Sequence, residues 1–473
     1  MRILHTSDWH FGRTLHGADL SAAFEQWAEF LLHTVRERQV DALLIAGDVY
    51  DRGVPPVAMV DLLSRTLAQL AESTHVVLIS GNHDSAQRLG FGHQLMRPEL
   101  AIRTDSRTCG EPVLLPDASG ALGAVVYAIP YLDPDVERSK LAPDMAIASE
   151  PAAGAWSEAG GLSEISNTTG ENENAEPGNR NKRKLLARSH EAVVRAALSR
   201  VRADILAHQS ERLGANGKPA PCIIMAHEFV VGGQPSDSEL DIHVGGVDSV
   251  PAALFDLRGV GGEPLVDYVA LGHLHGPQKV GGENGLEMRY SGSPIAFSFS
   301  EEKQQKSAVL LDFSASKKAP HPIPAKGSHS STKHDLIPER NQPKVELISA
   351  PVYRKLTTLR APFADLIAGA APGGEFAGAT ADYVRAIVTD PDRPVDLAAR
   401  LRQVYPGTLL IVHEGAQLNL DTAKTSIARA DPLNVLREFF AANGGRALND
   451  AEQDLLETLW EEYTVALQAK TTQ

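Results

Sequence analysis

Residues 1–10 read MRILHTSDWH, and this stretch decides the fold. An apolar run that is typical of a buried strand ends directly in Asp8 and His10, two side chains that bind metal ions. The same join between an apolar strand and a polar loop returns four times, at Gly47-Asp48, at residues 81–84 (GNHD), at His227-Glu228 and at residues 272–275 (GHLH). Open α/β sheets bind their ligands at the carboxyl ends of the strands, so these five segments predict one shared site at that edge.

The residues around these loops carry the periodicity of alternating strands and helices. Apolar strands are predicted at residues 3–6, 42–46 and 75–80, and helices at residues 20–38 and from Pro55 to about residue 71. This order is typical of buried, mainly parallel strands with helices on the faces of the sheet.

Further strands are predicted later in the chain, at residues 124–129, 222–226, 268–271, 288–291 and 307–313. Toward the end they are short and follow one another without helices, which suggests a second sheet with antiparallel pairing. We therefore expect an α/β fold in which two packed sheets are flanked by helices.

The chain of 473 residues is too long for one ordinary core. The strands and helices above predict a first domain at residues 1–313. Within it, residues 152–184 are rich in Gly, Ser, Asn and Glu, and we expect this insertion to be disordered. Residues 314–344 mix Lys, Pro, His and Ser, which predicts a linker.

A second ordered region is predicted after the linker. Strands at residues 381–389 and 409–413 around a helix at residues 396–404 indicate a small α/β module within residues 345–425. Two amphipathic helices, beginning near Asp431 and Asn449, are predicted within residues 430–473.

The composition is typical of a globular protein with an acidic surface. No apolar run reaches the roughly 20 residues that span a bilayer, so no membrane is expected. The two cysteines, Cys109 and Cys222, are too few for a disulfide framework, and the N-terminus lacks the apolar core of a signal peptide. These features predict a cytoplasmic protein. The formal net charge of −15 argues against DNA binding by the field of the whole chain, unless bound cations or a basic partner subunit compensate for it.

The side chains at the five strand ends form the ligand set of a dinuclear metal centre. In an extended segment residues i and i+2 point the same way, so Asp8 and His10 can bind one ion. Asp48 offers two oxygens and is the expected bridge between two ions. The predicted division is Asp8, His10, Asp48 and His275 on one ion, and Asp48, Asn82, His227 and His273 on the other.

This ligand set also predicts the metal and the chemistry. Oxygen and imidazole ligands without a thiolate suit two Mn²⁺ ions, with Mg²⁺, Fe or Zn²⁺ as alternatives. Two such ions about 3.5–4 Å apart support an in-line displacement at phosphorus, which points to hydrolysis of a phosphate ester. His83 is expected to face the substrate and protonate the leaving oxygen, and Asp84 to fix the orientation of His83.

Each segment taken alone has an ordinary structural explanation. A single His at a strand end is more often a packed or surface residue, and Gly47-Asp48 and Gly81-Asn82 could be turns. Asp51 and Arg52 could reach a phosphate or equally form a cap or an ion pair. Five such segments in order, each after an apolar strand, favour the metal centre.

The order of the motifs resembles that of the calcineurin-like metallophosphoesterases, and in particular the SbcD family of bacterial nuclease subunits. The resemblance rests on SDWHFGR at 7–13, GDVYDRG at 47–53, GNHDS at 81–85 and GHLH at 272–275, with further similar segments at 232–239 and 351–356. It implies a four-layer αββα domain, a cap domain at 345–425, and helices at 430–473 that dock on an ATPase subunit.

The resemblance also implies a function. SbcD-like proteins are Mn²⁺-dependent nucleases with 3′→5′ exonuclease activity on duplex DNA, and they cut single strands and hairpins endonucleolytically. They act as dimers with SbcC, an ABC-type ATPase, in DNA recombination, replication, repair and the processing of palindromes. Two alternatives keep the same fold: a phosphodiesterase for small molecules, and a catalytically inactive subunit whose role is assembly.

The chain departs from some relatives at two positions. Archaeal and eukaryotic relatives carry a second catalytic His where this chain has Asp51, so that role is not carried over. Protein Ser/Thr phosphatases carry Asn-His-Glu, where this chain has Asp84 after His83. The resemblance therefore favours the nuclease branch over the phosphatase branch.

Overall fold

The computed structural model describes most of the chain. The described residues are 1–142, 185–214, 217, 219–239, 249–281, 283–314, 340–414 and, between 448 and 460, all but 450, 454 and 457. The predicted insertion at 152–184, most of the predicted linker and the helix predicted from Asp431 lie outside them. The described pieces that follow Asn449 are helical, as predicted. Among the described residues, no helix is both long and apolar enough to cross a membrane.

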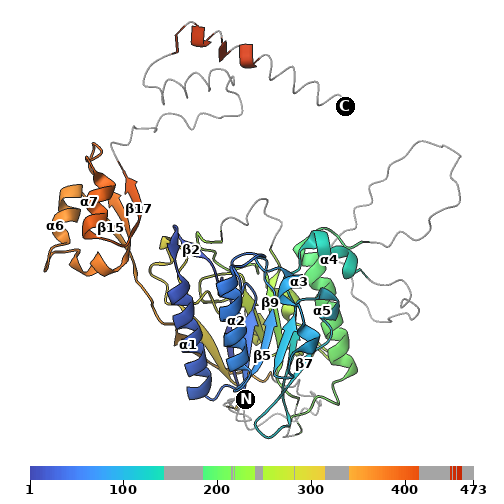
Figure 1. Ribbon diagram of the computed structural model, residues 1–473. Coiled ribbons are helices and arrows are strands. Elements are labelled where there is room, and N and C mark those ends of the chain that lie inside the picture. The colour runs from blue at the N-terminus through green and yellow to red at the C-terminus, as the bar shows by residue number, and fades with distance from the viewer. Residues whose placement is uncertain are drawn as a thin grey trace, which may run out of the picture. The chain divides into compact units, whose positions relative to one another are not determined.

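The first sheet has six strands in the order β14-β13-β1-β4-β5-β6 (Figure 1). Their bounds are β14 Lys344–Ser349, β13 Ser307–Asp312, β1 Arg2–Thr6, β4 Ala42–Ala46, β5 His75–Ile79 and β6 Leu100–Arg103. Strands β1, β4, β5 and β6 are parallel to their neighbours, whereas β13 and β14 pair antiparallel. The predicted parallel β-α-β-α-β unit is therefore confirmed.

The second sheet also has six strands, in the order β11-β12-β10-β9-β8-β7. Their bounds are β11 Gln278–Lys279, β12 Glu287–Tyr290, β10 Tyr268–Gly272, β9 Cys222–His227, β8 Leu122–Ala128 and β7 Val113–Pro116. The central strands β8, β9, β10 and β12 are parallel, and only β7 and β11 pair antiparallel. The prediction of an antiparallel second sheet was wrong, and β13 belongs to the first sheet.

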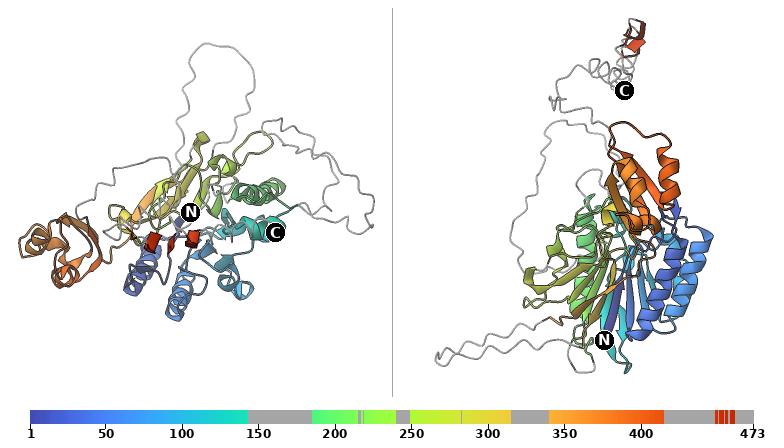
Figure 2. Two further views of the ribbon diagram at one scale, coloured as in Figure 1. Left: turned by 90° about the horizontal axis from the view of Figure 1, so that it is seen from above. Right: turned by 90° about the vertical axis from the view of Figure 1, so that its left-hand side faces the viewer.

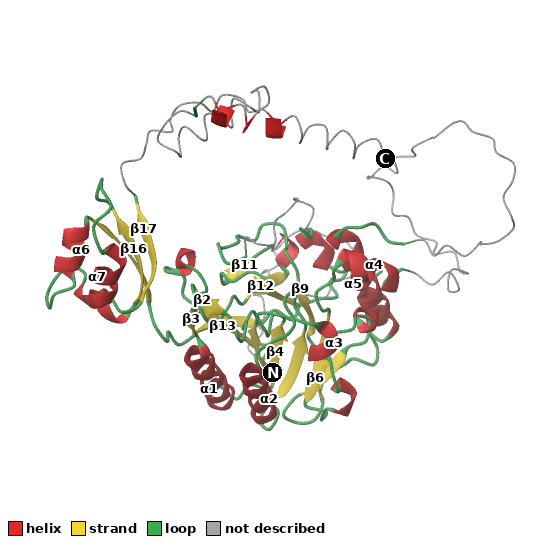
Figure 3. Cartoon of the chain, turned by 45° about the horizontal axis from the view of Figure 1, so that its top comes forward, coloured by secondary structure: helices red, strands yellow, loops and turns green. Residues whose placement is uncertain are grey.

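Helices cover the outer face of each sheet. On the first sheet lie α1 (Ser21–Glu37) and α2 (Val57–Leu70), and on the second lies α5 (His190–Ala207), beside α4 (Pro134–Lys140). Figures 2 and 3 show these helices on opposite sides of the paired sheets. The four layers agree with the predicted αββα architecture, although the helix α5 was not predicted.

Alternation along the strands explains how the layers hold together. In β4, Leu43 and Ile45 pack under the helices, whereas Leu44 faces the core between the two sheets. All five residues of β4 are buried, because a sheet covered on both faces needs apolar side chains on both. Each fully buried side chain of this kind contributes about 1.5–3 kcal/mol.

A smaller α/β module follows the first sheet in the chain. It consists of β15 (Leu356–Ala361), α6 (Phe363–Gly369), β16 (Tyr383–Val388), α7 (Leu397–Val404) and β17 (Thr408–His413), with strand order β15-β16-β17. The module was predicted to begin near residue 345. Strand β14, however, pairs with β13, so those residues belong to the first sheet.

Candidate metal centre

The five predicted segments meet at the carboxyl ends of their strands. The loop after β1 is tied to the loop after β4, because the backbone N–H groups of Asp8 and His10 donate to the carbonyls of Gly47 and Asp48, both at 3.0 Å. Asp8, His10, Asp48 and His273 have φ values of 52°, 46°, 50° and 107°. A positive φ strains residues that are not glycine, and such strain is typical of functional sites.

These backbone angles correct one premise of the sequence analysis. Asp8 and His10 were expected to share a side of an extended segment. Both instead have left-handed backbone conformations, and the turn, rather than strand alternation, brings their side chains together. The two residues converge as predicted, for a different geometric reason.

Close packing at the strand ends leaves no room for a side chain at two of the glycines. A Cβ atom on Gly272 would clash with the carbonyl oxygen of Ala46 and with the His227 ring. One on Gly81 would clash with the backbone and carboxylate of Asp48. The two sheets can therefore bring their ligands to one point only because these positions lack side chains.

A first group of ligand atoms comes from Asp8, His10 and His275, all buried. The Nε2 atoms of His10 and His275 face each other at 3.1 Å. Two bonds of about 2.1 Å to one ion at a right angle would separate the two nitrogens by about 3 Å. The buried Nδ1 of His10 has no hydrogen-bond partner among the described residues, so Nε2 is the ring atom directed at this point.

A second group surrounds the side-chain oxygen of Asn82. This Oδ1 atom lies 3.0 Å from Nε2 of His227 and 3.1 Å from Nδ1 of His273. The Asp48 carboxylate lies between the two groups, with Oδ2 at 3.4 Å from Nε2 of His227 and 3.6 Å from Nε2 of His10. The arrangement agrees with the predicted division into two ion positions bridged by Asp48.

The charges of these groups call for a cation. Burial raises the pKa of Asp8 to about 6. Burial alone would lower the pKa of His227, but the Asp48 and Asp8 carboxylates outweigh it and raise that pKa to about 10. Burial lowers the pKa of His10 and of His273 well below the usual value, so both rings are neutral donors. In the absence of metal, the carboxylates thus hold a proton on His227 that a bound divalent ion would displace.

His83 occupies a different position from the ligands. Its side chain is 30% exposed, whereas the Asp48 side chain is only 3% exposed, and its Nε2 lies 4.0 Å from Oδ2 of Asp48. Its Nδ1 lies 2.9 Å from the carbonyl oxygen of Asp51. A carbonyl only accepts, so Nδ1 carries a proton and Nε2 faces the metal centre.

Asp84 does not orient His83 in the way the sequence suggested. Its carboxylate accepts hydrogen bonds from the backbone N–H groups of Val49, Tyr50 and Gly81 at 3.1, 2.9 and 2.9 Å. These bonds hold the loop after β4 against the loop after β5. The orientation of the His83 ring comes from Asp51, whose carboxylate forms an ion pair with Arg13 at 3.8 Å.

Sequence reasoning missed a group of polar side chains behind His275. Ser238, Glu301 and Lys306 form a chain of hydrogen bonds that ends at the His275 ring. Only the similar segment at residues 232–239 gave any signal for this group. Glu301 and Lys306 lie in a stretch without a recognisable motif.

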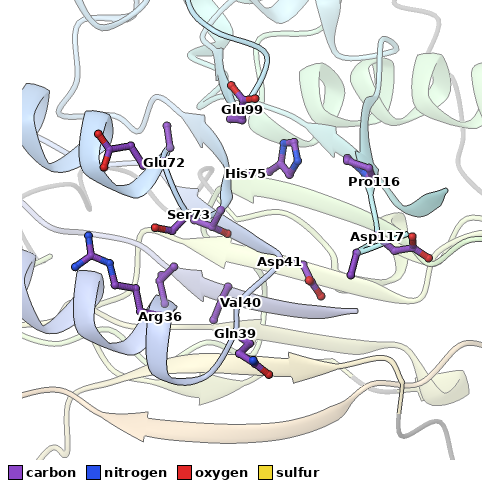
Figure 4. A pocket seen from close by; sticks show the side chains of 14 residues that line it. Arg36, Gln39, Val40, Asp41, Glu72, Ser73, His75, Glu99, Pro116 and Asp117 are labelled. Carbon is purple, nitrogen blue, oxygen red and sulfur yellow. The ribbon is translucent and has the colours of Figure 1, made fainter. Parts of the chain in front are cut away.

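A second collection of polar side chains lies at the opposite ends of the strands. Asp41, His75 and Glu99 stand at the amino ends of β4, β5 and β6 and line a pocket of about 580 Å³ (Figure 4). Asp41 accepts a hydrogen bond from the backbone N–H of Arg2 at 2.7 Å. This pocket is separate from the strand ends that carry the predicted ligands.

Comparison with known proteins identifies the family. The model of the calcineurin-like phosphoesterases matches residues 1–277, which include all seven predicted ligands. The chain belongs to the calcineurin-like phosphoesterase family. A second model, described as the type 5 capsule protein repressor C-terminal domain, matches residues 352–443. The metal-binding chemistry of the family agrees with the acidic and imidazole groups at the strand ends.

Curated relatives of this phosphoesterase share one name, which describes each of them as the SbcD component of the nuclease SbcCD. The protein of Escherichia coli (strain K12) is 32% identical over 67% of this chain and 66% of its own length. That of Bacillus subtilis (strain 168) is 31% identical over 66% of each chain. That of Rhodobacter capsulatus is 33% identical over 68% of this chain and 69% of its own. This similarity places the phosphoesterase with the SbcD-type members of the family, although the match spans just under two thirds of the first two relatives.

Proposed function

We propose that this chain is the nuclease subunit of an SbcCD-type complex, hydrolysing phosphodiester bonds of DNA with two Mn²⁺ ions. The observation that carries the proposal is the pair of ligand groups on either side of Asp48, with ring and carboxylate atoms 3.0–3.6 Å apart. The names of the relatives support DNA as the substrate. We further propose 3′→5′ exonuclease activity on duplexes and endonuclease activity on single strands and hairpins, in the cytoplasm.

The proposed roles follow from where each side chain lies. Asp8, His10 and His275 would hold one ion, Asn82, His227 and His273 the other, and Asp48 both. When bound, two such ions supply a water nucleophile at neutral pH and stabilise the charge of an in-line displacement. Neutral imidazoles and carboxylates without thiolates favour Mn²⁺ over Ca²⁺.

His83 is the proposed general acid. Because Nδ1 donates to the carbonyl of Asp51, a second proton on this ring must be on Nε2, which faces the metal centre. From there the cationic ring can give its proton to the leaving oxygen. Asp84 supports this step indirectly, by holding the loop that carries His83.

We propose that two copies of the chain form a homodimer through an apolar surface near this loop. Val54, Val57, Phe91 and Leu95 are 66%, 77%, 84% and 90% exposed, although all four are large and apolar. The two segments are linked, because Arg88 donates to the carbonyl of Gly53 at 2.7 Å. Exposed apolar patches of this kind mark protein interfaces.

The remaining partners are proposed from the relatives and from the charge of the chain. A DNA-binding ATPase subunit of the SbcC type would supply the basic surface that a chain of net charge −15 lacks. The module that begins at β15 would be the cap domain that orients DNA, and residues 430–473 the segment that docks on the ATPase. The resulting complex would act in recombination, replication and repair.

A cleavage assay tests the proposal directly. End-labelled duplex and hairpin DNA would be incubated with the purified chain in Mn²⁺, in Mg²⁺ and with chelator, beside a small generic phosphodiester. Mn²⁺-dependent DNA cutting is expected, with or without an added SbcC-type partner. Hydrolysis of the small phosphodiester alone, even with the partner present, would contradict the proposal and favour a small-molecule enzyme.

A further inference from the structure

The imidazole rings of the metal centre are oriented in two different ways. Nδ1 of His227 lies 2.8 Å from the carbonyl oxygen of Ala46, just as Nδ1 of His83 contacts a backbone carbonyl. A carbonyl only accepts, so Nδ1 of each ring carries the proton. His275 differs, because its Nδ1 lies 2.6 Å from Oγ of Ser238, a hydroxyl that can either donate or accept.

The Glu301 carboxylate decides the direction of that hydrogen bond. Its Oε1 accepts from Oγ of Ser238 at 2.6 Å and from Oγ of Ser298 at 3.0 Å. An ionised carboxylate only accepts, so the Ser238 proton points to Glu301, and Oγ must accept from Nδ1–H of His275. The lone pair of the His275 Nε2 atom then faces His10, at the first ion position.

Lys306 keeps this carboxylate ionised. Its ammonium group lies 2.5 Å from Oε2 of Glu301, and both side chains are buried. It also donates to the backbone carbonyl of His275 at 2.9 Å and to Oγ of Ser293 at 3.0 Å. Burial alone would raise the pKa of Glu301, but Lys306 outweighs it and holds that pKa well below its usual range. A buried ion pair is weak support for stability by itself, so its place behind a ligand points to another role.

We propose that Glu301, acting through Ser238 and held by Lys306, is a positioning residue that presents Nε2 of His275 to the first ion. The inference rests on the proposed function only in requiring the dinuclear centre. Hydrogen bonds to the outer nitrogen of a ligating histidine fix its tautomer and orientation, and losing them costs about 10–100-fold in metal affinity. Because His227 is held by a backbone carbonyl instead, the loss should fall on one of the two ions.

Mn²⁺ binding by the full chain tests the proposal without any need for DNA. Calorimetry would give the affinity of each ion, and electron paramagnetic resonance would distinguish a coupled ion pair from a single ion. Ser238→Ala should weaken one of the two binding events about 10–100-fold and leave the other unchanged. Ser238→Thr keeps the hydroxyl and should restore both. Glu301→Gln should resemble Ser238→Ala, since an amide group can donate to Ser238 and allow its proton to turn toward His275.

The matched control is Glu302→Gln, which removes the neighbouring carboxylate. Glu302 accepts instead from the backbone N–H and the hydroxyl of Thr358, at 3.1 and 2.6 Å, so this variant should bind both ions as the wild type does. Thermal unfolding in chelator should be the same for the wild type and Ser238→Ala, which excludes a general loss of folding.

Two results would overturn the positioning role: normal binding of both ions by Ser238→Ala, or an equal loss in Glu302→Gln. A wild-type chain that binds no Mn²⁺ would instead refute the dinuclear centre and with it the proposed function.

Discussion

The two ends of the same strands collect similar side chains and differ in how they hold them. At the amino ends Asp41, His75 and Glu99 are half-buried around an open pocket. At the carboxyl ends Asp48 and His227 are almost completely buried, with their ligand atoms 3.4 Å apart. Acidic and imidazole side chains alone therefore do not make a metal centre; burial and convergence do.

The backbone explains why only one end converges. Beyond the carboxyl ends, strained residues with positive φ turn the loops of both sheets inward, and glycines allow the loops to touch. At the amino ends the polar groups satisfy nearby backbone, as Asp41 does for the N–H of Arg2. The predictions below test this contrast, beginning with the largest expected effect.

Asp48→Asn should abolish cleavage at the carboxyl end. The substitution removes the charge that both ligand groups share, so the loss should exceed the ~10²–10³-fold that follows removal of one stabilising group. Mn²⁺ binding would be measured beside the rate of DNA cutting. Retention of two tightly bound ions in this variant would contradict the bridging role of Asp48.

His83→Ala should separate chemistry from metal binding. Loss of a general acid slows a reaction by about 10²–10⁴-fold, whereas His83 is not among the proposed ligands, so both ions should remain bound. Single-turnover cleavage and Mn²⁺ stoichiometry would be measured on the same preparation. If metal is lost in parallel with activity, the assignment of His83 as an acid fails.

His5 tests the effect of burial between the two ends. It is fully buried, with Nδ1 at 3.0 Å from the hydroxyl of Tyr268, and burial lowers its pKa to about 3. The unfolded chain takes up a proton on this residue below about pH 6.5, whereas the folded chain does not until about pH 3. The free energy of unfolding contributed by neutral His5 is therefore present above pH 6.5 and is lost as the pH falls, by up to about 1.4 kcal/mol per pH unit.

Urea unfolding of the wild type and of His5→Gln between pH 7 and pH 5 would measure this term. The difference in unfolding free energy between the two should shift against the wild type as the solution becomes more acidic. A difference that stays constant over this range would mean that His5 is protonated equally in both states.

The smallest effect is expected at the amino ends. A His75→Gln, Glu99→Gln double variant changes the lining of the pocket in Figure 4 without touching the carboxyl ends. Cleavage should stay within about twofold and stability within about 1 kcal/mol, because surface substitutions each change it by no more than ±0.5 kcal/mol. A loss of activity comparable to that of His83→Ala would mean that this pocket is also part of the functional site.

Much of the fold could be predicted because it depends on local burial. The bounds of β4 were predicted at Ala42–Ala46, and α1 was predicted to within one residue at each end. Pairing could not be predicted in the same way. β13 and β14 join the first sheet, far along the chain from β1, and the pattern of an apolar strand is the same whichever neighbour it has.

The sequence by itself determined the types of ligand, their order and their place after apolar strands, because side-chain chemistry and periodicity are local properties. Only the tertiary structure decided which ligands face each other, since His10 and His275 meet through the packing of two sheets. It also decided that Asp51 orients His83 and that Glu301 reaches His275 through Ser238. Such contacts join residues far apart in the chain, and their geometry depends on sheet order and strained loops that no local pattern records.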